Sequence, residues 1–152
     1  LTYILIYAAM NIGIFAFVFL MKRKGKYVEE ISELSGVSKN HPLTSLSLMI
    51  ILFSLAGIPP LAGFFAKFYI FMAVVESGMY TLAIIGLVTT VVSAFYYIRI
   101  IKIMYFDESK KPFENYKDIS IQGSLFVCCV LLTGFFLYPS ALDDVVSKIS
   151  IF

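Results

Sequence analysis

The sequence predicts an all-α integral membrane protein with four transmembrane helices, and three observations support this fold class. Of its 152 residues, 60% are hydrophobic and 14% are charged, with a mean hydropathy of +0.90, whereas soluble domains are about 45–50% apolar and about 25% charged. The apolar residues form long runs, and the basic residues gather between those runs. These features exclude a disordered chain, a nucleic-acid binder with a basic face and a cytosolic enzyme.

Four apolar runs are long enough to cross a bilayer of about 30 Å, which takes about 20 helical residues. Backbone polar groups inside a bilayer must be satisfied within their own segment, so we expect these runs to be helices. The predicted helices cover about residues 1–21, 43–75, 79–105 and 119–142, and the predicted loops cover 22–42 and 107–118. Residues 1–152 are therefore predicted to form one membrane segment.

The first predicted helix, 1–21, holds no charged residue. Basic residues follow it, whereas a secretory signal peptide carries them in front, so this run is predicted to stay in the protein. The chain begins with Leu1 instead of Met. Two alternatives remain open for that start: a segment of something longer, or the use of another codon.

The loop 22–42 has a pattern of its own. Its apolar residues recur at helical spacing and predict a short helix in the membrane interface that ends near Gly36. These residues are Tyr27, Val28, Ile31 and Leu34. Pro42 then suits the first turn of the second transmembrane helix, where a backbone N–H has no helical partner anyway.

The distribution of Lys and Arg predicts the orientation in the membrane. Ten of the twelve basic residues lie in or beside the loops 22–42 and 107–118, and none lies in the connection Glu76–Gly78. Both loops are therefore expected on the cytoplasmic or mitochondrial-matrix side, with both termini on the opposite side. The short connection makes the helices 43–75 and 79–105 antiparallel neighbours.

The second predicted helix is too long for a single continuous crossing. Its 33 residues would measure about 50 Å, which exceeds the hydrocarbon thickness. The sequence supplies a break, where two prolines remove backbone donors and glycine loosens the helix on both sides. The residues of this break are Gly57, Pro59, Pro60 and Gly63. Broken helices handle ions in transporters; the alternative is an ordinary proline kink.

Lys67 is the charged residue inside this second apolar run. It lies eight residues before Val75, about 12 Å along a helix, and a lysine side chain can snorkel only part of that distance. A charge there is costly, so it should face a protein interior with water or a partner carboxylate. We interpret Lys67 as a proton-relay residue; the alternative is a snorkelling lysine without a role.

Other polar residues support weaker interpretations. Asn11 is expected to bond another helix, with an ion site as the alternative, and His41 to be a loop residue, with a proton donor as the alternative. Tyr97 belongs to a group of aromatic and basic residues that predicts an interfacial belt. The adjacent Cys128 and Cys129 lack metal-ligand or redox spacing and are interpreted as packing residues. The sequence contains no metal-binding or cofactor-binding motif.

The run SLAGIPPLAGFFAKFYIF, Ser54–Phe71, resembles the signature of the antiporter-like subunits of respiratory complex I, the proton-pumping NADH–quinone oxidoreductase. Mrp-type antiporter subunits share that signature. Three further stretches resemble subunit 2 of this family, called subunit N in bacteria: Tyr7–Met21, Glu29–Leu43 and Ser93–Phe106. The first of them is similar to its eleventh helix. The resemblance covers nearly the whole chain and weakens after about Asp107.

The resemblance implies a role in a larger enzyme. The chain looks like the last four helices of the subunit, and the family's proton-relaying lysine in a broken helix falls on Lys67. It implies a membrane-arm fragment of NADH:quinone oxidoreductase that takes part in proton translocation coupled to NADH oxidation and quinone reduction. Lys67 is then expected to relay protons near the outer exit. This chain should hold no cofactor, since FMN, iron–sulfur clusters and quinone are expected in other subunits.

The resemblance also implies partners and a location. The partners are the rest of subunit 2 with its N-terminal helices, either as a separate polypeptide or in the same one, other membrane-arm subunits and the lipid bilayer, but no nucleic acid. The location is the mitochondrial inner membrane or the bacterial plasma membrane. Two alternatives stay open: an Mrp-type cation/proton antiporter subunit, and a structural segment of the membrane arm that does not pump.

Overall fold

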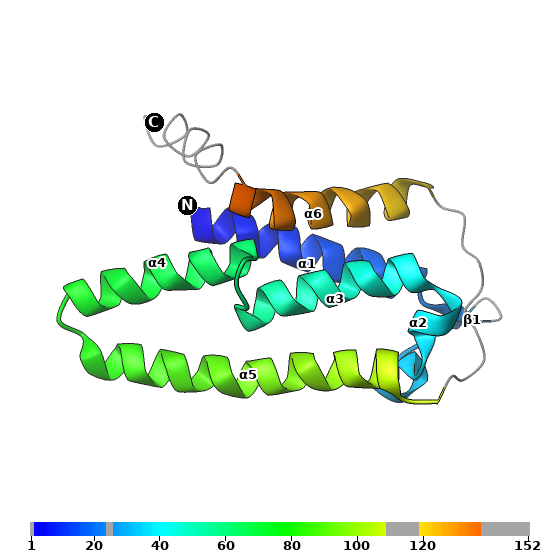
Figure 1. Cartoon of the computed structure of the whole chain (residues 1–152), viewed down its shortest axis with the longest axis horizontal. Coiled ribbons are helices and arrows are strands. Elements are labelled where there is room, and N and C mark those ends of the chain that lie inside the picture. Colours follow the sequence, from blue (N-terminus) through cyan, green and yellow to red (C-terminus); the bar gives the residue numbers. More distant parts are fainter. Residues whose placement is uncertain (1, 24–25, 109–118, 138–152) are drawn as a thin grey trace.

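The computed structural model describes residues 2–23, 26–108 and 119–137, and most of them are helical (Figure 1). The longer helices are α1 (Thr2–Leu20), α3 (Pro42–Ala56), α4 (Ala62–Glu76), α5 (Tyr80–Phe106) and α6 (Ile119–Leu137). The connection from α1 to α3 contains β1 (Lys22–Arg23), β2 (Lys26–Tyr27), the 3₁₀ helix η1 (Ile31–Leu34) and the short helix α2 (Val37–Asn40).

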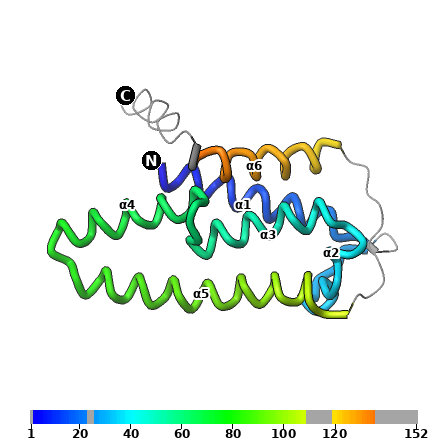
Figure 2. The backbone as a smooth tube through the Cα atoms, viewed as in Figure 1, coloured from blue at the N-terminus to red at the C-terminus, as the bar shows by residue number. Residues whose placement is uncertain are grey.

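The long helices lie along one common direction. α3 and α4 follow each other end to end, and α5 returns antiparallel beside both of them (Figures 1 and 2). α1 and α6 pack on each other and on α3, and they reach only the near end of α4. The outer parts of α4 and α5 therefore extend past the other helices as a hairpin.

The buried core lies between α1, α3, α6 and the last turns of α5. Its largest fully buried side chains are Ile51, Met104 and Leu132, which are at most 1% exposed. Gly13 lets α1 approach α3 closely, because a Cβ there would lie 2.6 Å from Cδ1 of Ile51. The core thus holds the C-terminal end of α5, whereas the N-terminal part of α5 packs on α4.

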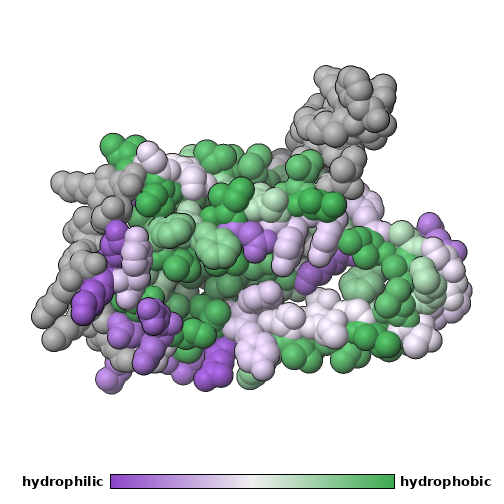
Figure 3. Space-filling model, turned by 180° about the vertical axis from the view of Figure 1, so that it is seen from behind, coloured by the Kyte–Doolittle hydropathy of each residue, from purple (hydrophilic) through white to green (hydrophobic). Residues whose placement is uncertain are grey.

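The length and hydropathy of the helices bear on membrane crossing. Among the described residues, α1 and α5 are the helices long and apolar enough to span a bilayer alone. α3 and α4 have 15 residues each, about 22 Å, which is shorter than a hydrocarbon core of about 30 Å. Figure 3 shows apolar side chains over most of the surface, with hydrophilic ones gathered at the end that holds β1 and β2.

The connection from α1 to α3 differs from the prediction. The expected interfacial helix through Tyr27 and Leu34 is wrong in its first half, because Tyr27 pairs with Lys22 in the hairpin. Glu30 is extended, so only the 3₁₀ turn η1 is helical here. Gly36 directly follows the C-cap of η1 in a left-handed conformation, with φ at 63°, and it is also the N-cap of α2. Its N–H donates to the carbonyl of Ile103, which ties the connection to α5.

The ends of the longer helices can be compared with the expected ranges. α3 begins at Pro42, one residue before the predicted start, with His41 at its cap position. α5 is displaced by one residue at each end relative to 79–105. Residues 138–142 of the last predicted helix, and most of the predicted loop 107–118, lie outside the described residues.

Candidate functional site

The junction between α3 and α4, residues 57–61, begins with a left-handed glycine. Gly57 has φ 83° and ψ 37°, a conformation that glycine adopts without a Cβ clash. Its N–H donates to the carbonyl of Ser54 at 3.0 Å, and the N–H of Ile58 donates to that of Phe53 at 3.0 Å. These bonds close the end of α3 as a Schellman motif and satisfy two of its last carbonyl groups.

Lys67 satisfies a third carbonyl. In a continuous helix the N–H of residue 59 would donate to the carbonyl of Leu55, but Pro59 has no N–H. Nζ of Lys67 donates to this same oxygen at 2.7 Å. The lysine thus replaces the donor that the proline removes, and it places its positive charge at the negative end of α3.

A backbone N–H group at the start of α4 finds its hydrogen-bond acceptor on α3. The N–H of Gly63 lies in the first turn of α4, where it has no helical acceptor, and it donates to Oγ of Ser54 at 3.0 Å. Ser54 is completely buried. A Cβ at Gly63 would overlap the carbonyl oxygen of Ser54, so only glycine allows the two helix ends to meet this closely.

The rest of the junction faces outward. Ile58, Pro59 and Pro60 are exposed on the surface of the chain, and the peptide bond between the two prolines is cis. Gly57 lies on the other side, toward the lysine, since a Cβ at this position would come within 3.2 Å of Cδ of Lys67. Gly57 and Gly63 therefore lie beside Lys67, whereas Pro59 and Pro60 face the surface.

Lys67 lines a cavity of about 190 Å³ between α1, α3, α4 and α5. Part of the wall is apolar or small, formed by Met10, Leu55, Gly63 and Ala66. The rest carries hydroxyl groups, from Tyr3, Tyr7, Thr89, Thr90, Ser93 and Tyr97. In the space-filling view an opening separates α5 from the helices that face it (Figure 3). A lysine among hydroxyl groups in a cavity can exchange protons through water.

Most of this wall was not predicted from the sequence. None of its threonines was a candidate residue, Ser93 stood only at the start of the stretch Ser93–Phe106, and Tyr97 was assigned to an interfacial belt. The available signal was a row of small and hydroxyl residues on α5 at spacings of three and four, which is common where helices pack in membranes. The expected partner carboxylate for Lys67 is not among the described residues that line its cavity.

The two weaker candidates lie away from Lys67. Nδ2 of Asn11 donates to the carbonyl of Tyr7 at 2.8 Å, and Asn11 lines a separate cavity of about 410 Å³ between α1 and α6. His41 stands at the opposite end of α3 from the junction, about 22 Å away along the helix. The structure therefore brings neither residue into the wall around the lysine.

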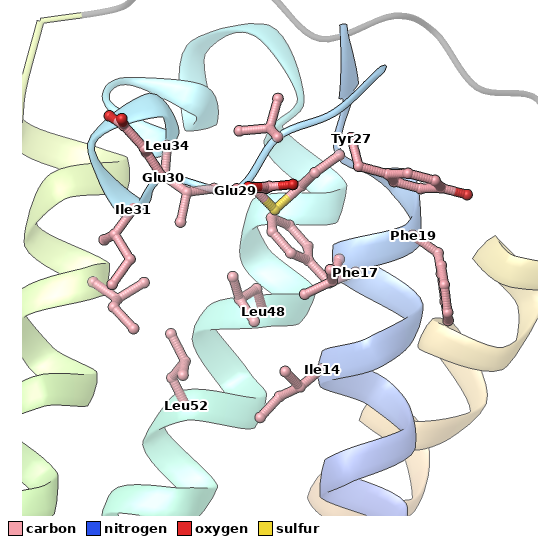
Figure 4. A pocket seen from close by; sticks show the side chains of 14 residues that line it. Ile14, Phe17, Phe19, Tyr27, Glu29, Glu30, Ile31, Leu34, Leu48 and Leu52 are labelled. Carbon is pink, nitrogen blue, oxygen red and sulfur yellow. The ribbon is translucent and has the colours of Figure 1, made fainter. Parts of the chain in front are cut away.

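A larger cavity of about 480 Å³ lies near the β-hairpin, between α1, α3 and η1 (Figure 4). Its wall is mostly apolar, with Phe17, Leu48 and Leu52 at its centre and Glu29 and Glu30 at the hairpin side. Among the described residues that line this cavity, those with ionisable side chains are Tyr27, Glu29 and Glu30, and all three lie near the β-hairpin. The candidate site is therefore the smaller cavity around Lys67.

The described residues hold no group of three or more His, Cys, Asp or Glu side chains that could bind a metal ion. Cys128 and Cys129 are both buried, 5% and 8% exposed, and form no disulfide. Sγ of Cys129 donates to the carbonyl of Ser47 at 3.5 Å. The contacts of this pair are thus packing contacts and one weak hydrogen bond.

The chain is similar in sequence to known membrane proteins of one family. A family model described as NADH:quinone oxidoreductase/Mrp antiporter, TM, matches residues 1–93. The NADH-quinone oxidoreductase subunit N of Pelagibacter ubique is 53% identical over 151 residues, which cover 99% of this chain and 32% of that protein. Its counterpart from Parvibaculum lavamentivorans is 50% identical over 142 residues, which cover 93% and 29%.

A solved structure is similar as well. A chain of respiratory complex I from Thermus thermophilus with bound aureothin superposes with a TM-score of 0.77 at 27% identity, covering 91% of this chain and 32% of that chain. The chain thus spans about a third of the length of the relatives that it matches.

Proposed function

The chain belongs to the NADH:quinone oxidoreductase/Mrp antiporter transmembrane family, and on that premise we propose that it is part of a membrane-arm subunit of proton-translocating NADH–quinone oxidoreductase. Subunit N is the counterpart, since relatives of that name align with almost the whole chain. The function is a share in proton translocation coupled to NADH oxidation and quinone reduction. The observation that carries this function is a lysine held at a helix junction inside a hydroxyl-lined cavity.

The proposal includes an arrangement in the membrane. α1 and α5 each cross once, the predicted run 119–142 that begins with α6 crosses once, and α3 and α4 cross together as one broken helix, because each of these two is too short alone. The basic segments 22–42 and 107–118 face the inner side, and both termini face the outer side. The bacterial relatives favour the plasma membrane over the mitochondrial inner membrane as the location.

Lys67 acts as the proton-relay residue in this proposal. Its ammonium form is stabilised by the Leu55 carbonyl and by the negative end of α3. Loss of the proton removes a positive charge from that helix end, while an N–H of the amine can still donate to the same oxygen. The lysine can therefore gain and lose a proton without unfolding the junction, and it passes protons on toward the outer exit.

The other components of the reaction are assigned elsewhere. FMN, iron–sulfur clusters and quinone belong to other subunits, because this chain provides proton transfer and no redox chemistry of its own. The partners are the remainder of the subunit and other membrane-arm subunits. The outer parts of α4 and α5 support such contacts, since large apolar side chains there are exposed in this chain, among them Phe68, Met72, Ile84 and Val88.

Replacement of Lys67 tests the proposal. Lys67→Ala should lower the number of protons translocated per NADH oxidised by the assembled enzyme in membrane vesicles, while assembly and quinone reduction remain. Lys39→Ala is the matched control, because Lys39 is an exposed lysine of the inner connection. An unchanged proton ratio in Lys67→Ala would contradict the proposed function and would favour a structural segment that does not pump.

An Mrp-type cation/proton antiporter subunit is the second candidate, because the matching family model includes that group. It predicts sodium efflux that depends on Lys67. Sodium and proton movements measured in the same vesicles distinguish the two functions. Proton movement that depends on NADH oxidation favours the oxidoreductase subunit, and sodium efflux that depends on Lys67 favours the antiporter subunit.

A further inference from the structure

We infer that three hydroxyl side chains of α5, Thr90, Ser93 and Tyr97, form a proton-conducting row that exchanges protons with Lys67 through water. We call these three residues the α5 hydroxyl row. The inference rests on the proposed function and adds the residues that exchange protons with the lysine.

The row occupies one face of α5. Thr90, Ser93 and Tyr97 are partly covered, whereas neighbours between them such as Val92 and Tyr96 are exposed. The spacings of three and four residues place the three side chains one above another. From the first to the last of them the helix rises about 10 Å, so the row is long enough to bridge a cavity.

All three side chains line the same cavity as Lys67. A cavity can hold a water molecule when it has about 10–15 Å³ of free space and two to four polar partners. The cavity volume of about 190 Å³ is enough for several water molecules, and the hydroxyl groups supply the partners. The gaps between Lys67 and the row can therefore be bridged by water.

The hydroxyl groups of the row are oriented by their own helix. Oγ1 of Thr90 donates to the carbonyl of Gly86 at 2.9 Å, and Oγ of Ser93 donates to that of Thr89 at 3.0 Å. Each hydroxyl hydrogen is thereby directed at the backbone, while the oxygen keeps acceptor capacity for a water in the cavity. To relay a proton, a hydroxyl accepts one from a cavity water on its free lone pair and releases its own hydrogen from the backbone carbonyl to the next water. Rotation of the hydroxyl then restores its bond to the carbonyl, with one proton moved.

The positions along the helices give the row a direction. Lys67 lies nine residues before Glu76, and Thr89 lies nine residues after Tyr80, so the antiparallel helices bring the lysine level with the first part of the row. From Thr90 to Tyr97 the row leads away from the connection between α4 and α5. Under the proposed orientation it leads from the lysine toward the inner half of the membrane.

The row ends at Tyr97. Farther along α5 the covered positions are Ile101 and Met104, which are 7% and 0% exposed and belong to the apolar core. The cavity is also lined by Tyr3 and Tyr7, in the first turns of α1, which are 36% and 47% exposed. Protons therefore pass between Tyr97 and Lys67 along the row through water, and a proton that reaches Lys67 converts its neutral amine to the ammonium form.

Tyrosine substitutions on α5 test the row with a matched control. Tyr97→Phe removes only the hydroxyl at the end of the row and should lower the proton ratio per NADH in vesicles to the level of Lys67→Ala. Tyr96→Phe makes the same change one residue away on the exposed face and should leave the ratio unchanged. A ratio in Tyr97→Phe equal to that in Tyr96→Phe, together with a lowered ratio in Lys67→Ala, overturns the row and leaves the proposed function intact.

A second pair of variants separates proton conduction from packing. Thr90→Val keeps the shape and removes the hydroxyl, whereas Thr90→Ser keeps the hydroxyl and removes the methyl group. The proton ratio should fall in Thr90→Val and be retained in Thr90→Ser, with both enzymes assembled. Equal loss in the two variants would show that Thr90 acts through packing and would overturn its place in the row. A normal ratio in Lys67→Ala itself would contradict the proposed function on which the row depends.

Discussion

At the residue scale, the hydrogen bond from Lys67 to the Leu55 carbonyl links the proline motif to the lysine. Pro59 removes the donor that this carbonyl would have in a continuous helix, and Nζ of Lys67 takes that place at 2.7 Å. The spacing of twelve residues between Leu55 and Lys67 follows from the need to turn the chain and begin α4. The motif is therefore one structural unit, in which the proline creates the site that the lysine occupies.

A prediction at this scale concerns Ser54. Ser54→Ala removes the acceptor of the Gly63 N–H and leaves that buried donor unpaired, which costs about 1–3 kcal/mol. Hydrogen–deuterium exchange of the peptide that contains Gly63 should then be about 5- to 150-fold faster. Ser47→Ala is the control, because its hydroxyl only bonds the carbonyl of Leu43 in its own helix. Unchanged exchange in Ser54→Ala would contradict the role of Ser54 as a cap.

At the element scale, α3 and α4 behave as two helices whose ends satisfy each other. α3 supplies an acceptor to α4 through Ser54, and α4 supplies a donor to α3 through Lys67. Helix ends buried without such partners carry unsatisfied backbone groups. The junction is thus stable without a continuous helix, and this stability allows a polar cavity to form beside it.

A prediction at this scale concerns Gly63. In a helix interior, Gly→Ala normally stabilises by about 1 kcal/mol, but a Cβ at Gly63 would overlap the Ser54 carbonyl. Gly63→Ala should therefore displace α4 from α3 and lower both the amount of assembled enzyme and its proton ratio per NADH. Gly134→Ala on α6 is the matched control, because a Cβ there meets nothing within 4 Å. If both variants assembled and pumped equally, the close approach at Gly63 would have no functional importance.

At the scale of the whole molecule, charge and exposure indicate how the chain is placed. The hydrophilic surface gathers at the end with β1 and β2, and the long α5 exposes apolar side chains along most of its length (Figure 3). Such a surface is stable in contact with lipid or with other apolar helices. The molecule therefore has one polar end and a large apolar side.

The orientation yields a prediction at this scale. Ser77→Cys places a thiol in the connection between α4 and α5, and Lys39→Cys places one in the inner connection, both at exposed positions. A membrane-impermeant maleimide should label Ser77→Cys in intact cells and Lys39→Cys only in inverted vesicles. The unsubstituted chain is the control, because Cys128 and Cys129 are buried. The reverse labelling pattern would contradict the proposed orientation.

Local sequence signals account for the parts of the site that were predicted. Gly57, Pro59, Pro60 and Gly63 act on their own backbone, so their effect is visible without any knowledge of neighbouring helices. Lys67 is conspicuous because a charge in an apolar run is costly wherever the run lies. The predicted helix through Tyr27 failed for the opposite reason, since pairing with Lys22 in a hairpin overrode the helical spacing.

The sequence by itself determined the membrane class, the interruption at the prolines and the position of the lysine, because composition, proline chemistry and charge are properties of a segment alone. The tertiary structure decided that Lys67 donates to Leu55, that Ser54 caps α4, and that the α5 hydroxyl row faces the lysine. Those contacts join residues nine or more positions apart. A threonine or serine has the same local sequence signal on any face of a helix, and only packing fixes which face meets the cavity.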